Sequence, residues 1–436
     1  MGSYWRRIAE CGRDIHLFLA YALISFLGIG VFALMFNLYL VELGYDEGYI
    51  GAFNAVYTLS MGLTCLGVGY LINRFGNWLC IVIGTIGFTA SMLAMCFATD
   101  RWLLLVLAAF NGIGSAFLMT NQMPFVIEWT PRQHTATIAA LSSALNSASI
   151  MLGSLLGGVL PGIIAVAANV EAESVTSYRW TLAAGAALTG LSVLPMLAMG
   201  AVRRDRHHHD FRVSHAQLPN HRVRRQARRD IIALTLLGLF LAFGVGAIEP
   251  FYNVLLEEMG TPTSTIGLIF AVSGLVTTFV SLGGPTVARR IGLSAAQVVI
   301  RLYHVPFHLA LIVFPTPLVV SLAYSTRKTS AGMAWPLESA HVGSLLPPSA
   351  RAHAFGMRSA SWNIGYAFAA FVSGQVISRT GSYTPAYISL AVFCVLSVAV
   401  YVVAYGGRTP LEDATDPKPA TVSEALSPSE TPATGD

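Results

Sequence analysis

Long apolar runs recur along the whole 436-residue chain, and they leave few folds open to it. A helix of about 20 apolar residues crosses the hydrocarbon core of a bilayer. Only 11% of the residues are charged, against about a quarter in a soluble protein. The pattern predicts an all-α integral membrane protein with about twelve transmembrane helices. The expected spans are 16–42, 48–72, 78–98, 102–127, 135–164, 178–201, 230–256, 263–287, 293–314, 318–345, 350–377 and 383–405.

The basic residues are distributed unevenly between the two sides of these spans. If the chain starts in the cytoplasm and crosses the membrane an even number of times, most of the 26 lysines and arginines fall in cytoplasmic segments. Cytoplasmic loops of membrane proteins carry such an excess. We therefore expect a multi-pass protein of the cell (inner) membrane with both termini in the cytoplasm.

Two segments lack apolar runs. Residues 202–229 are rich in arginine and histidine and are expected to form a cytoplasmic linker between an N-terminal bundle, 1–201, and a C-terminal bundle, 230–405. Residues 406–436 are rich in Pro, Thr, Ser and Glu and are expected to be a disordered cytoplasmic tail. Neither the linker histidines, His207 to His209, nor the five cysteines have a metal-binding or redox spacing. We expect no metal, no cofactor and no nucleic-acid partner.

The two halves of the chain repeat one another. Several residues of the first half recur unchanged in the second half, always the same number of positions later. After a one-residue insertion, further identical pairs follow. A register of this length indicates a duplication, and two homologous bundles can rock around a site near the membrane midplane to give alternating access. The pairs include Asn37 with Asn253, Gly44 with Gly260, Gly51 with Gly267, Gly76 with Gly292 and, after the insertion, Asn146 with Asn363.

The loop "GYLINRFG" between the second and third spans resembles the loop motif of the major facilitator superfamily. Gly69, Arg74 and Gly76 match that motif, whereas Asn73 stands at its acidic position. A fainter copy, "PTVARRIG", carries Arg289 and Arg290 in the second half. The resemblance implies two pseudo-symmetric six-helix bundles, a secondary transporter and a monomer in the lipid bilayer.

In that family the acidic residue of the loop is thought to brace it against the start of span eleven, which here carries Arg351 and Arg358. Asn73 offers these arginines a neutral acceptor, and a charge-assisted bond is roughly twice as strong as a neutral one. We therefore predict a weakened conformational latch and a population shifted toward the cytoplasm-open state.

Span five contains "GSLLGGVLPG", which resembles the glycine–proline pattern of the family's exporters with the proline displaced. This observation favours export slightly. The alternative is that these small residues allow close helix packing.

Ionisable side chains inside a bilayer are costly and are therefore candidates for function. The candidates for proton coupling or substrate binding lie in the second half; they are Glu249, Arg327, Lys328, Glu338 and His341. Arg327, Glu338 and His341 share one stripe of span ten, with about 16 Å between the first two. The alternative is charge pairing that joins neighbouring spans. Arg301, His304 and His308 share a face of span nine. They could likewise line the cavity or form contacts that join neighbouring spans.

Neutral polar and aromatic residues are expected to line the cavity. They could supply hydrogen bonds or stacking surface to a solute, or act singly as contacts between helices. They are Asn37, Asn54, Tyr57, Asn121, Gln122, Asn146, Tyr252, Asn253, Trp335, Trp362, Asn363 and Tyr366.

The sequence thus predicts a secondary transporter of a small organic solute, coupled to protons. Export of an amphipathic compound and uptake of an anionic metabolite both stay open, and so does a non-transporting sensor of the same fold. The chain has no phosphate-binding loop and no nucleophile–base pair at diagnostic spacing, which argues against an ATP-driven pump and an enzyme.

Overall fold

A computed structural model describes residues 12–130, 134–199, 221–281, 283–346 and 348–406. A few side chains within these ranges, those of Asn73 and Pro285 among them, lie outside the description. The tail and most of the linker, including His207 to His209, also lie outside it.

The first half, as far as it is described, is a bundle of helices in which four spans are continuous and two are divided in two. It consists of α2 (Arg13–Glu42), α3 (Glu47–Phe75), α4 (Asn77–Phe97), α5 (Arg101–Thr120), α6 (Gln122–Trp129), α7 (Thr135–Ala168), α8 (Val175–Leu191) and α9 (Val193–Met199). The breaks fall at Asn121 in the fourth span and at Ser192 in the sixth.

The second half is broken more often. It consists of α10 (His221–Gly246), η1 (Glu249–Phe251), α11 (Tyr252–Glu258), α12 (Thr263–Ser281), α13 (Gly284–Ile291), α14 (Leu293–Leu302), α15 (Val305–Val313), α16 (Pro317–Leu345), α17 (Pro348–Thr380) and α18 (Thr384–Tyr405). Helix α10 begins within the segment expected to be linker, because arginine is a good helix former and extends the helix beyond its apolar part.

Across the described residues, ten candidate spans are long and apolar enough to cross a membrane. Helices α16 and α17, of 29 and 33 residues, are also long enough. Their charged side chains, Arg327 and Arg358 among them, lower their hydropathy. The expected all-α architecture of about twelve spans is confirmed.

Backbone geometry repeats between the halves. Gly44 and Gly260 have φ angles of 84° and 73°, and Gly76 and Gly292 have 82° and 83°. Both pairs belong to the sequence repeat, and a positive φ is readily adopted by glycine alone. The two halves therefore turn their chains in the same way at equivalent loops.

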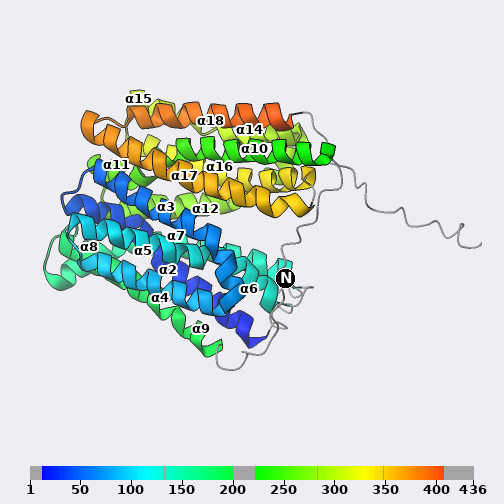
Figure 1. Cartoon of the computed structure of the whole chain (residues 1–436). Helices are drawn as coiled ribbons and strands as arrows, with labels where there is room; N and C mark the ends of the chain where they lie inside the picture. Colours follow the sequence, from blue (N-terminus) through cyan, green and yellow to red (C-terminus); the bar gives the residue numbers. More distant parts are fainter. Residues whose placement is uncertain (1–11, 131–133, 200–220, 282, 347, 407–436) are drawn as a thin grey trace, which may run out of the picture.

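The halves meet along α3 with α17 and along α7 with α12 (Figure 1). Paired glycines allow this approach. A Cβ atom on Gly374 would lie 2.9 Å from Cα of Gly51, and one on Gly158 would lie 2.9 Å from Cα of Gly267. Gly51 and Gly267 are equivalent in the repeat, so the two contacts between the halves use matching positions on α3 and α12.

The glycines of "GSLLGGVLPG" pack against neighbouring helices. A Cβ atom on Gly153 would lie 2.9 Å from Cα of Gly30 in α2, and Gly158 meets α12. Close packing accounts for this pattern, which was the one observation that favoured export.

The start of α2 and the end of α18 lie toward the same end of the molecule (Figure 1). We call the opposite end, which carries the α2–α3 and α17–α18 loops, the outer end. The distribution of arginines predicts that it faces away from the cytoplasm.

Candidate functional site

Span seven is interrupted where its carboxylate lies. Helix α10 ends at Gly246, and the short helix η1 begins at Glu249. Pro250 has no amide hydrogen to donate, so a continuous helix cannot form all its hydrogen bonds here. The break brings the Glu249 side chain against α16.

Glu249 forms ion pairs with two cations of α16. Nη2 of Arg327 contacts one carboxylate oxygen, and Nζ of Lys328 lies 2.9 Å from the other. The side chain of Arg327 is 8% exposed and that of Lys328 is 37% exposed. Arg327 lies ten residues after Pro317, which is about 15 Å along the helix and close to the middle of a bilayer. We call Glu249, Arg327 and Lys328 the midplane cluster; its formal charge is positive.

One donor of this cluster has no partner. Nε of Arg327 is buried and makes no hydrogen bond with any of the described residues. Buried polar groups are nearly always paired in folded proteins. An unpaired guanidinium nitrogen beside an exposed ammonium group indicates a place where an acceptor can bind.

Aromatic side chains surround the midplane cluster. The ring of Tyr324 lies 5.4 Å below Nζ of Lys328 and stacks on Phe270. Tyr366 of α17 packs on Gly246 at the end of α10, three residues before Glu249. Tyr57 of the first half donates to Oγ of Ser115 at 2.9 Å. Both Tyr57 and Tyr366 are partly exposed.

Two asparagines join the halves beside this cluster. Nδ2 of Asn37 donates to the carbonyl of Pro250 at 2.7 Å, and Nδ2 of Asn253 donates to the carbonyl of Leu34 at 2.7 Å. Asn37 and Asn253 are equivalent in the repeat, and so are Leu34 and Pro250. The two bonds form a reciprocal pair across the pseudo-twofold axis. Asn54 adds a bond of 3.3 Å to Oδ1 of Asn37.

Further contacts join the halves nearer the outer end. Nε2 of Gln375 donates to the carbonyl of Gly48 at 2.9 Å, and the hydroxyls of Tyr178 and Thr263 lie 2.8 Å apart. Ser378 donates to Asp46, and this hydrogen bond holds the pKa of the Asp46 carboxyl below its usual value. Together with the asparagine pair, these contacts close the outer side of the midplane cluster.

Glu338 lies in a second group of charges, which we call the buried triad. Its carboxylate contacts Arg301 of α14 and Arg358 of α17, and each of the three side chains is at most 3% exposed. Arg301 also donates to Gln297 at 3.1 Å and to Ser397 at 3.3 Å. The triad connects α14, α16, α17 and α18.

The stripe expected along span ten is thereby divided. Arg327 pairs with Glu249, Glu338 pairs with two arginines, and His341 lies 2.6 Å from the hydroxyl of Tyr401. Sequence reasoning missed Arg301 as a partner of Glu338. The available signal was an arginine in an apolar span, since such a charge needs an acidic partner nearby.

The two tryptophans lie beside the triad. The guanidinium carbon of Arg358 is 4.1 Å from the ring centre of Trp335 and 6.0 Å from that of Trp362. Trp335 is 50% exposed. An aromatic surface therefore borders the triad.

The other cavity candidates mostly contact neighbouring helices, although Tyr252 also packs on Tyr324 beside the midplane cluster, with 5.1 Å between the ring centres. Asn146 donates to Gln122 at 2.7 Å, and Asn121 is fully buried. Asn363 packs on Gly62. Tyr252 bonds His308, whose other ring nitrogen contacts the carbonyl of His304. These contacts match the helix-contact alternative.

The loop residues expected to form the latch are mostly exposed. Arg289 donates to Thr286 at 3.1 Å, and Arg351 donates to the carbonyl of Leu346 at 3.0 Å. Arg358 is engaged by Glu338. The side chain of Asn73 lies outside the description, so the latch remains a prediction. Its remaining members are Gly69, Arg74, Gly76 and Arg290, of which Arg74 contacts the ring of Phe75.

Groups of His, Cys, Asp and Glu that could hold a metal ion are absent from the described part of the chain. Two pseudo-symmetric helical bundles with charged groups near the midplane form the fold of a membrane transporter. A sequence profile of the Major Facilitator Superfamily matches residues 17–326 and 329–432. The chain belongs to this superfamily, which indicates a transporter rather than an enzyme.

Solved structures of transporters share the fold. The nucleoside transporter NupG superposes with a TM-score of 0.69 at 14% identity, covering 91% of this chain and 100% of its own. A bacterial homologue of the human lysosomal transporter Spinster, inward-facing and occupied, gives 0.69 at 14%, covering 89% and 96%. A D-xylose–proton symporter gives 0.65 at 14%, covering 90% and 97%. No curated protein matches the sequence. Identities this low establish the fold alone.

Proposed function

We propose that the protein is a secondary transporter of a small organic anion, coupled to protons through Glu249. The observation that carries this proposal is the midplane cluster, in which one carboxylate is shared by two cations and Nε of Arg327 lacks a partner. The net positive charge faces a first half whose midplane groups are neutral amides and hydroxyls.

The coupling follows from competition for the same cations. A carboxylate or phosphate group of a solute would approach Lys328, the most exposed member, and bind Nε of Arg327. Glu249 would then lose part of its ion pairing. An unpaired carboxylate away from water is costly, and it becomes neutral by taking up a proton. Anion and proton would therefore bind together.

Alternating access would expose the midplane cluster first to one side of the membrane and then to the other. The contacts of Asn37, Asn253 and Ser378 close the outer side. Separation of the halves at these contacts would open the midplane cluster outward. The direction of net flux would follow the combined gradients of proton and anion. Packing of the span-five glycines leaves no observation that favours export over uptake.

The proposal is tested by counterflow in proteoliposomes with a panel of solutes matched in size. Liposomes loaded with one anion should accumulate the same radiolabelled anion, and neutral or cationic analogues should not exchange. Lys328→Gln and Arg327→Gln should each lose exchange, whereas Arg289→Gln, an exposed arginine outside the cluster, should retain it. The proposal would be contradicted if the protein exchanged neutral solutes and if Lys328→Gln and Arg327→Gln left that exchange unchanged.

A further inference from the structure

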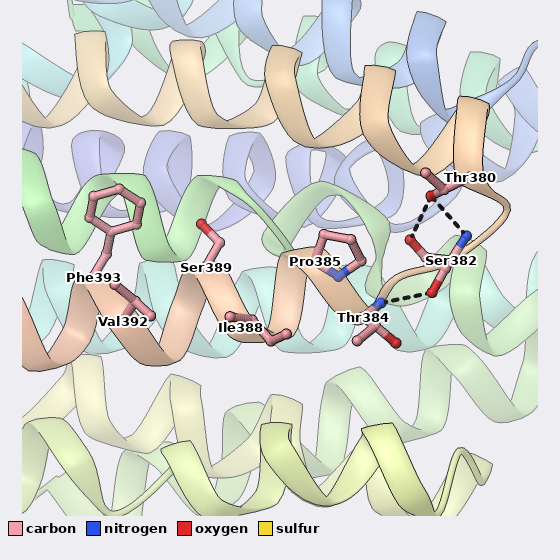
Figure 2. Close-up of a pocket in the computed structure, with 8 residues that line it drawn as sticks. All are labelled: Thr380, Ser382, Thr384, Pro385, Ile388, Ser389, Val392 and Phe393. Atoms are coloured by element: carbon pink, nitrogen blue, oxygen red, sulfur yellow. Dashed lines mark hydrogen bonds between the residues drawn. The ribbon is translucent and has the colours of Figure 1, made fainter.

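A depression opens on the membrane-facing side of α18, away from the midplane cluster. It has a volume of about 510 Å³ and lies along the first turns of α18 and the α17–α18 loop (Figure 2). Its apolar part is formed by Ile388, Val392 and Phe393. Ile388 and Val392 are 47% and 48% exposed. In a transmembrane helix, an exposed apolar stripe of this kind contacts lipid chains.

The floor of this groove is aromatic. The ring of Phe393 stacks on Phe243 of α10 with 5.1 Å between the centres, and Phe243 meets Phe368 of α17 at 5.7 Å. The rings fix the spacing of α10, α17 and α18. The groove is therefore a feature of the packed bundle rather than a gap left by one mobile side chain.

The outer rim of the groove is polar. Thr380, Ser382 and Thr384 bring hydroxyl groups to it, as Figure 2 shows. The amide of Ser382 donates to Oγ1 of Thr380, and the amide of Thr384 donates to Oγ of Ser382, each at 3.3 Å. These two bonds use the oxygens as acceptors, and the hydroxyl of Ser382 keeps its proton for another acceptor. Arg379 precedes the rim in the last turn of α17 and is exposed.

The dimensions match one leaflet. From Thr384 to Phe393 the helix rises about 14 Å at 1.5 Å per residue. Half of the hydrocarbon core measures about 15 Å. An acyl chain along Ile388, Val392 and Phe393 would thus place its glycerol and phosphate at the rim. The hydroxyls of the rim complement a phosphate group, and Arg379, the residue before Thr380, adds an exposed positive charge next to the rim.

We propose that this groove is a specific binding site for a glycerophospholipid of the outer leaflet, with one acyl chain on the aromatic floor and the phosphate at Arg379. The rim also belongs to the outer closure. Ser378, one residue before Arg379, bonds Asp46 of the first half. A lipid that orders this loop stabilises the outer-closed conformation.

The test uses delipidated full-length protein and native mass spectrometry. A phosphatidylglycerol and a diacylglycerol with the same chains are titrated separately. The phospholipid should bind the wild-type chain more tightly. Arg379→Gln should weaken phospholipid binding roughly tenfold, the loss of one charge-assisted bond, and leave diacylglycerol binding unchanged. Ser389→Trp, which fills the groove, should weaken both ligands.

Arg101→Gln serves as the matched control. Arg101 is an outer arginine of the first half, where it lies over the ring of Tyr49, and its removal should leave lipid binding unchanged. Equal affinity for the two lipids, or an Arg379→Gln variant that binds phospholipid as the wild type does, would overturn the proposal. Because Arg379 is exposed, Arg379→Gln should fold normally. It therefore tests the proposal even if Ser389→Trp does not fold.

Discussion

The two halves share one backbone plan but differ in the charges at its centre. Gly76 and Gly292 turn alike, and Asn37 and Asn253 form reciprocal bonds. Yet Glu249 stands where the first half has Ala33. The midplane cluster and the buried triad both belong to the second half. The shared features form contacts between the halves, whereas the charges occur in the second half alone among these two clusters, which is why the proposal places binding and coupling there.

The largest expected effect on stability concerns the buried triad. Glu338→Gln leaves Arg301 and Arg358 buried without their counter-charge, which costs about 3–5 kcal/mol. The melting temperature in detergent should fall strongly. Glu249→Gln, whose site is more accessible to solvent, should lower it much less. Equal losses in the two variants would remove the distinction between a structural and a functional acid.

The next effect concerns coupling. Glu249→Gln removes the only carboxylate that the midplane cluster contains, so flux driven by a pH gradient should fall to the level of empty liposomes. Counterflow exchange, which moves no net proton, should persist. Both assays belong in the same proteoliposome preparation. Retained gradient-driven flux would show that the proton travels elsewhere.

The reciprocal asparagines test the symmetry directly. Asn37→Ala and Asn253→Ala each remove one hydrogen bond between the halves, of about 1 kcal/mol. Asn37→Ala also removes the 3.3 Å bond from Asn54, which lies within the first half. Each should raise the outward-open population about fivefold, and by similar amounts. Accessibility of a single outer cysteine to an impermeant reagent measures this. Asn146→Ala, which loses a bond to Gln122 within one half, is the control. Strongly unequal effects of the first two variants would break the symmetry argument.

A smaller effect depends on pH. The hydrogen bond from Ser378 lowers the pKa of Asp46 in the closed state. The stabilisation of closure is therefore complete above the ordinary pKa of an aspartate, about 3.9. It is lost as pH falls through the lowered value. Ser378→Ala should abolish this acid-induced opening by making Asp46 titrate alike in both states. Identical cysteine accessibility profiles for both proteins at low pH would exclude this role.

The smallest effect is expected at the loop between α3 and α4. Asn73→Asp introduces a charge that a nearby arginine can bind, which should stabilise closure of the cytoplasmic side by about 0.5–1 kcal/mol at an exposed site. Labelling of a cysteine on the cytoplasmic side should slow accordingly. Asn73→Gln, which keeps the side chain at this position neutral, is the matched control. No change in labelling would argue against the latch.

Much of the fold could be predicted from the sequence, because bilayer thickness dictates span length and the repeat fixes the relation of the halves. Glu249, Arg327 and Lys328 were also identified, since charges in apolar spans stand out. Their pairing could not be predicted. Helical periodicity places Arg327, Glu338 and His341 on one stripe, but their partners come from η1, α14, α17 and α18. Which side chains meet between helices depends on packing that a one-dimensional pattern does not encode.

The most direct test of the account is proton uptake on anion binding. Purified protein in weakly buffered detergent solution, with a pH indicator, is mixed with an anion that exchanges in counterflow. The account predicts that wild-type protein takes up close to one proton per bound anion, because the anion displaces Glu249 from its cations. Glu249→Gln should bind the anion with no uptake. Binding without proton uptake by the wild type would contradict the central claim.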